Sequence, residues 1–101
     1  MERRAYERVN TNLPVKYYCE DNCHAGTVHN VSEQGMFIST GNFLPCTNSL
    51  EIHIPMNREM LCCEAEIRRI EKIDDSNYTM GIELITPPDT YLKFVSGLRM
   101  P

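Results

Sequence analysis

Three arginines near the start of the chain could bind a phosphate or a guanine base. Three residues separate Arg4 from Arg8, and Arg3 stands directly before this pair in a polar segment without apolar periodicity. A guanidinium group donates paired hydrogen bonds that suit a phosphate or the Hoogsteen edge of guanine. Taken alone, the segment favours a plain interpretation, because charged and solvated termini are common. The arginines therefore need a second group of polar residues before they predict a site.

A second polar motif lies between two predicted strands. Asn30 offers an amide, Ser32 a hydroxyl, and Gly35 allows a tight turn or the close approach of a ligand. Taken alone, this motif is also consistent with a polar turn between strands.

Together the two motifs are specific. The pattern Arg4-x-x-x-Arg8, followed by Asn30-x-Ser32-x-x-Gly35, resembles the paired signature of the PilZ domain family. The segment 78–84 is similar to the final barrel strand of that family, and the resemblance spans the whole chain, 1–101. It implies an all-β fold, a six-stranded antiparallel β-barrel with an N-terminal arm and a C-terminal α-helix. It also implies a receptor for the bacterial second messenger cyclic di-GMP, which we expect to be cytoplasmic. Because no residues suggest a general acid paired with a nucleophile, we do not expect an enzyme.

The resemblance also implies roles for individual side chains. The expected ligand-binding residues are Arg3, Arg4, Arg8, Asn30, Ser32, Gly35 and Arg69. The motif arginines would bind phosphate and guanine, and the amide oxygen of Asn30 would accept from a guanine N–H. Arg69 would stack on a guanine face, with a surface ion pair to Glu71 or Glu83 as the alternative. An arginine at position 3 implies two stacked ligands per protomer.

The elements that must position these residues follow from apolar spacing. Strict alternation predicts a strand over 13–19, and similar patterns predict strands over 25–31, 36–40, 50–54, 60–73 and 78–85. The stretch 64–69 also fits a helical pattern. After two prolines the spacing becomes helical, which predicts a helix over 87–101 capped by Thr86. The chain is thus expected to be one domain with an arm at 1–12, a barrel at 13–86 and this helix.

Composition excludes several classes of protein. The chain has 101 residues, 42% of them hydrophobic and 24% charged, which is typical of one globular domain. No apolar run is long enough to cross a membrane, and no apolar stretch follows the N-terminal charges as in a signal peptide, so we expect an intracellular protein. A net charge of -4 and the absence of Trp disfavour a barrel that binds single-stranded nucleic acid.

Cysteine is the unusual residue type in the composition. Five cysteines, an odd number, predict free thiols in a reducing compartment. The alternative is a zinc site formed by Cys19, Cys23 and His24 with Cys46 or the Cys62–Cys63 pair. Because no Cys-x-x-Cys spacing is present, we expect neither a metal nor any other cofactor.

Two principal functions remain open. The first is a cyclic di-GMP effector that changes its arm or surface on binding and regulates a protein partner in motility, exopolysaccharide synthesis or biofilm formation. The second is a PilZ-like adaptor that contacts a protein without binding the nucleotide. The complete pair of motifs favours the first.

Overall fold

The computed structural model describes residues 8–41, 49–56 and 58–99. Within these ranges, six strands are followed by one helix. They are β1 (Val9–Cys19), β2 (Asn22–Val31), β3 (Gly35–Thr40), β4 (Ser49–Met56), β5 (Glu59–Asp74), β6 (Asn77–Leu84) and α1 (Asp89–Arg99). Within the described ranges, no helix is both long and apolar enough to span a membrane.

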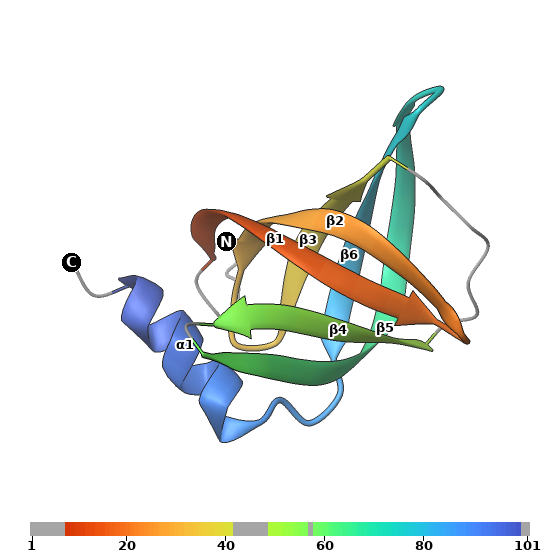
Figure 1. Cartoon of the computed structure of the whole chain (residues 1–101). Coiled ribbons are helices and arrows are strands. Elements are labelled where there is room, and N and C mark those ends of the chain that lie inside the picture. Colours follow the sequence, from red (N-terminus) through yellow and green to blue (C-terminus); the bar gives the residue numbers. More distant parts are fainter. Residues whose placement is uncertain (1–7, 42–48, 57, 100–101) are drawn as a thin grey trace.

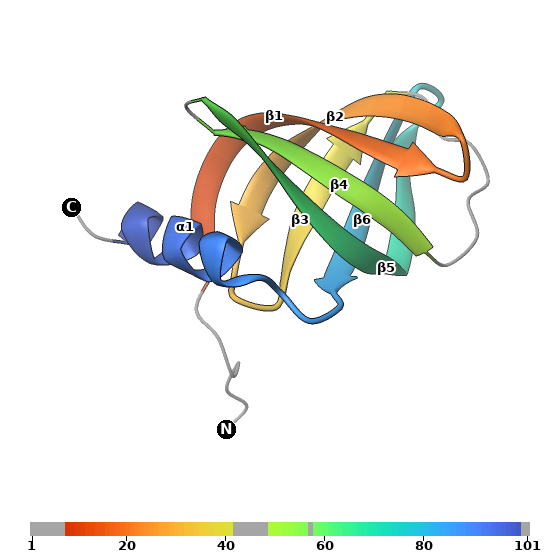
Figure 2. The ribbon, with the colours of Figure 1, turned by 60° about the horizontal axis from the view of Figure 1, so that its bottom comes forward.

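The strands form a closed antiparallel barrel in the order β1-β2-β3-β6-β5-β4 (Figure 1). Closure pairs the outer strands β1 and β4, so the sheet has no exposed edge along that seam. The helix α1 lies beside one end of the barrel in both ribbon views (Figures 1 and 2). The predicted fold class, a six-stranded antiparallel barrel with a C-terminal helix, is confirmed.

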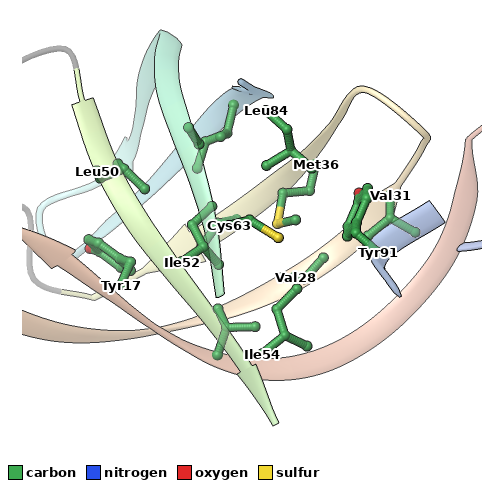
Figure 3. Close-up of a cluster of buried hydrophobic side chains, with 14 of the residues drawn as sticks. Tyr17, Val28, Val31, Met36, Leu50, Ile52, Ile54, Cys63, Leu84 and Tyr91 are labelled. Carbon is green, nitrogen blue, oxygen red and sulfur yellow. The ribbon is translucent and has the colours of Figure 1, made fainter. Parts of the chain in front are cut away.

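Alternating side chains explain why these segments form strands around one core. In β4, Leu50, Ile52 and Ile54 are buried, whereas Glu51 and His53 face outward. The other strands and α1 supply further buried aliphatic, sulfur-containing and aromatic side chains, with Tyr17 of β1 and Tyr91 of α1 at opposite ends of the cluster in Figure 3. Burying an aliphatic side chain of this size contributes roughly 1.5–3 kcal/mol to folding.

The N-terminal part of the barrel begins earlier than expected. The predicted arm covered 1–12, but β1 starts at Val9 and pairs through Val9 with Val31 and through Asn10 with Asn30. The register shifts between Asn10 and Leu13, which marks an irregularity in the ladder. Such a bulge breaks the period of two, so the sequence shows alternation only from Leu13 onward.

The start of the helix also differs from the prediction. The carbonyl of Pro88 accepts hydrogen bonds from the amides of Tyr91 (2.9 Å) and Leu92 (3.1 Å), so α1 begins at Asp89. Thr86 lies outside the helix with a positive φ of 49°, and the prediction that it caps the helix is wrong. Tyr91 and Val95 form the buried face of α1, at the helical spacing that the sequence indicated.

The cysteines divide into two classes. Cys19 is disulfide-bonded, so the expectation of a free thiol is wrong at this position. Cys23 and Cys62 are exposed free thiols, whereas Cys63 is a buried one. Burial raises the pKa of Cys63 to about 11, because the thiolate would lose its hydration inside the barrel. Cys46 lies outside the described residues.

Candidate functional site

A pocket of about 350 Å³ lies at the barrel surface, beside the loop between β2 and β3. Four residues singled out from the sequence line it: Arg8, Ser32, Gly35 and Arg69. The other lining residues are Gln34, Phe37, Arg68, Gly81, Ile82 and Glu83. The fold therefore gathers side chains from the start of the chain, the second motif and two distant strands into one cavity.

Asn30 forms a hydrogen bond with Arg8, one of the three arginines that line the pocket among the described residues. The Arg8 guanidinium donates a hydrogen bond from Nη1 to Asn30 Oδ1 at 2.6 Å. The pairing of Asn10 with Asn30 brings the start of β1 beside the end of β2, which makes this contact possible. The contact links the two sequence motifs and holds the Arg8 guanidinium next to the pocket.

The loop between β2 and β3 is stabilised by its own backbone. The amide of Ser32 donates to the carbonyl of Gly35 at 2.8 Å, and the amide of Gln34 lies 3.3 Å from the Ser32 hydroxyl oxygen. The amide of Leu84 donates to the carbonyl of Gln34 at 2.7 Å, which ties the loop to the end of β6. These contacts hold the loop in a defined shape beside the pocket.

Gly35 has a role that its sequence position did not reveal. A Cβ atom at Gly35 would stand 2.1 Å from the carbonyl oxygen of Ile82, far inside any normal contact. Gly35 pairs with Glu83 across the β3–β6 ladder, and only a residue without a side chain permits this approach. The sequence predicted a tight turn or closeness to a ligand, whereas the structure shows closeness to the backbone of β6.

Tyr91 connects the same loop to the helix. Its buried hydroxyl donates a hydrogen bond to the carbonyl of Ser32 at 2.7 Å and lies 3.2 Å from the carbonyl of Gly35. Burial raises the pKa of Tyr91 well above its usual value, so the hydroxyl stays protonated and remains a donor. Sequence reasoning assigned Tyr91 only to the apolar face of the helix, because no local pattern shows which loop it reaches.

A bulge in β5 places two adjacent arginines in the pocket. Neighbouring residues on a regular strand face opposite sides, but the register shifts between Ile67 and Arg69. As a result both Arg68 and Arg69 line the cavity. The sequence analysis named Arg69 alone, because a bulge depends on how a strand pairs with its neighbour and leaves no local signal.

The two arginines have different neighbours. Arg68 donates to Glu83 Oε1 from Nε and Nη2, both at 2.6 Å. The stem of Arg69 lies against Gly81, where its Cγ would be 3.1 Å from an added Cβ, and its guanidinium lies 3.4 Å from Glu71. Of the ion pairs considered for Arg69, the one with Glu71 is present. Both pairs are exposed and therefore weak, so the guanidinium groups can exchange partners at small cost.

Phe37 adds an aromatic surface that the sequence analysis missed. It lies on β3 opposite Gly81, and its ring edge would be 3.3 Å from a Cβ at that glycine. The missing side chain of Gly81 thus lets the ring of Phe37 and the stem of Arg69 lie close to its backbone. Arg3 and Arg4, the remaining predicted ligand residues, lie outside the described residues.

Comparisons with known proteins identify relatives of this fold. A family model described as the PilZ domain matches residues 2–95. A structure of the Bacillus subtilis inhibitor of motility MotI/DgrA is similar with a TM-score of 0.74, at 22% identity over 94% of this chain. The match covers 48% of that protein, so this chain spans about half of its length.

A second similar structure is the PilZ domain of YcgR from Escherichia coli, described with c-di-GMP. It has a TM-score of 0.72 and 13% identity, over 94% of this chain and 87% of that one. The comparison with curated proteins gave no match.

Proposed function

Because this chain belongs to the PilZ domain family, we propose that it binds cyclic di-GMP and passes the binding signal to a partner protein. One observation carries the proposal. The pocket collects Arg8, Ser32, Gly35 and Arg69, and Asn30 holds Arg8 at its rim. The solved PilZ domain of YcgR, described with c-di-GMP, supports this choice of ligand.

The charges of the pocket suit a dinucleotide with two phosphates. Arg8 is exposed and stands at the rim, so it can bind a phosphate or guanine O6 and N7 with charge-assisted hydrogen bonds. We propose that Arg4 and Arg3 add further guanidinium groups from the segment before β1. Asn30 can keep its contact with Arg8 and still accept from a guanine N–H, because an amide oxygen has two lone pairs.

Flat surfaces in the pocket suit the guanine bases. Phe37 supplies an aromatic face, and the guanidinium of Arg69 is a planar group that stacks on a base once it leaves Glu71. Stacking of a base on an aromatic side chain contributes roughly 1–3 kcal/mol. The Ser32 hydroxyl completes the site as a hydrogen-bond donor to phosphate or guanine.

The contacts of the loop suggest how binding is transmitted. A ligand that touches Ser32 and Gly35 acts on the two carbonyl groups beside the Tyr91 hydroxyl. Movement of the loop therefore changes the hydrogen bonding of α1. Together with contacts from Arg3 and Arg4 to the ligand, this would alter the surface that a partner recognises. One similar structure is an inhibitor of motility, which makes motility one candidate output beside exopolysaccharide synthesis and biofilm formation.

Titration calorimetry with cyclic di-GMP, cyclic di-AMP and GTP tests the proposal. We expect cyclic di-GMP to bind most tightly, because adenine presents a donor where guanine presents the O6 acceptor. Arg8→Ala should weaken binding by about 10- to 100-fold, since a charge-assisted hydrogen bond is worth roughly 1.5–3 kcal/mol. Arg58→Ala removes an exposed arginine that does not line the pocket and should leave affinity unchanged.

The stoichiometry tests the proposed role of Arg3. We expect about two ligands per protomer, since a third guanidinium offsets the repulsion between stacked dianions, and Arg3→Ala should move the ratio toward one. Equal binding of cyclic di-AMP would contradict the guanine-specific site. A protein that binds none of the nucleotides would favour the alternative, an adaptor that works only through protein contacts.

A further inference from the structure

A cluster of metal-ligating side chains lies on the outer face of β4 and β5, away from the nucleotide pocket. Glu51 and His53 come from β4, and Cys62 comes from β5. One carboxylate oxygen, one imidazole nitrogen and the thiol sulfur all lie within 4.8 Å of one another. None of the three residues lines the pocket that contains Arg8 and Arg69.

The register of the sheet fixes this arrangement. His53 pairs directly with Cys62 across the β4–β5 ladder, and Glu51 is two residues before His53 on the same face. Ile52, which lies between Glu51 and His53, and its ladder partner Cys63 face the core and are buried. The three ligand groups are therefore attached to a rigid, paired part of the barrel, and only their side chains need to adjust.

His53 gives an independent reason to expect a ligand. Its Nε2 atom is buried and makes no hydrogen bond with the described residues, and it lies 3.5 Å from Glu51 Oε2. The ring packs against Tyr18, with 4.6 Å between ring centroids, which restricts its orientation. A buried nitrogen without a hydrogen bond is costly, and a metal ion bound between the three groups would remove that cost.

We propose that Glu51, His53 and Cys62 bind one divalent transition-metal ion, with zinc as the best fit. Zinc accepts thiolate, imidazole and carboxylate ligands at about 2.0–2.3 Å, so its ligand atoms stand roughly 3.5 Å apart in a tetrahedral site. The observed separations need only small rotations of the exposed Glu51 and Cys62 side chains. Three protein ligands leave the fourth position for water or for a group from a partner.

The surrounding charges favour a cation. Glu64 pairs with Glu51 across the ladder, and Glu20 joins them around an adjacent pocket of about 330 Å³. Lys16, which pairs with His53 from β1, is the opposing positive charge, and it is exposed. Among the described residues named here, three carboxylates stand against one ammonium group, and the resulting negative potential raises the local concentration of divalent cations.

The proposed set differs from the one considered from the sequence. That set began with Cys19 and Cys23, but Cys19 is disulfide-bonded and Cys23 belongs to β2, which pairs with β1 rather than with β4. Linear spacing could not find the new set, because His53 and Cys62 become neighbours only through the β4–β5 hairpin.

Titration of the protein with Co²⁺ and Zn²⁺, with the Cys19 disulfide kept intact, tests the proposal. Co²⁺ reports a bound thiolate by its charge-transfer absorption, and competing Zn²⁺ should displace it at one equivalent. His53→Gln and Cys62→Ser should each lower the affinity by about 100-fold or more, since loss of even an outer-shell partner costs 10- to 100-fold. Cys23→Ser is the matched control, because Cys23 is an exposed thiol outside the cluster, and it should leave the titration unchanged.

Three results would overturn the proposal. They are no thiolate absorption in the unmodified protein, equal affinity in Cys62→Ser, or loss of binding in Cys23→Ser. His53→Gln and Cys62→Ser change side chains on the outer face of the barrel, so we expect both variants to fold. Unchanged thermal melting of the metal-free proteins verifies this. Glu51→Gln provides a third variant that keeps the size of the side chain and removes its charge.

Discussion

Replacing Gly35 by alanine tests the link between the loop and the barrel. The added methyl carbon would stand 2.1 Å from the carbonyl oxygen of Ile82, whereas real Cβ contacts under 3.0 Å are essentially never seen. The obstacle is backbone, so it cannot rotate away as a side chain can. Either β3 or β6 must move by about 1 Å, which also strains the hydrogen bond between the Leu84 amide and the Gln34 carbonyl.

The expected loss of stability follows from these two effects. Overpacking of a close-packed site costs roughly 1–3 kcal/mol, and a weakened hydrogen bond adds about 0.5–1.5 kcal/mol. Gly35→Ala should therefore lower the free energy of unfolding by about 2–4 kcal/mol. In a domain of this size that corresponds to a fall in Tm of roughly 10–25 °C.

Urea denaturation and thermal melting measure the effect, with Gly97→Ala as the control. Gly97 lies in α1, and a Cβ there would meet nothing within 4 Å. Because alanine favours the helix, this control should gain about 0.5–1 kcal/mol. A Gly35→Ala protein as stable as the unmodified one would show that the close approach of β3 to β6 is not required, and would refute the reasoning.

Three further variants or conditions have defined outcomes. Tyr91→Phe should cost about 1–2 kcal/mol of stability because it leaves the buried Ser32 carbonyl without this donor, whereas Tyr18→Phe on the barrel surface should change stability by less than about 0.5 kcal/mol. Equal melting of the two proteins would contradict the role of Tyr91. Thr86→Asn should raise stability by about 1 kcal/mol, since Asn tolerates the positive φ of 49° and a β-branched residue does not; a lower Tm would exclude this. Stability should be full at neutral pH and fall as the pH rises above about 9 toward 11, because the raised pKa of Cys63 keeps its thiol protonated in the folded state while the unfolded chain ionises. A pH titration of Tm that stays flat over this range would contradict the assignment.

Much of the barrel could be predicted because strand periodicity is local. Leu50, Ile52 and Ile54 show their common face in the sequence itself, and so do the inward residues of the other strands. The bulges near Asn10 and Arg69 could not be found in this way, because each depends on how a strand pairs with its neighbour. Because the bulge near Asn10 hides the start of β1, the predicted arm extended to residue 12 although the strand begins at Val9.

The candidate site was predictable only where a motif carries it. Arg8, Ser32 and Gly35 lie together as the two motifs indicated, and Arg69 joins them. Other side chains reach the pocket or its loop only through the tertiary structure. Arg68 reaches it through the bulge in β5, and Tyr91 reaches the loop from a helix 56 residues beyond Gly35. No spacing rule in a single sequence connects positions so far apart.

The most direct test of the central claim maps the nucleotide onto the barrel. Isotope-labelled protein should be titrated with cyclic di-GMP while the amide chemical shifts are followed by NMR. We expect the largest changes at 32–37 and 81–83, where the pocket lies, and little change at His53 on the outer face of β4. Saturable shifts confined to another part of the barrel, or no shifts at all, would contradict the account.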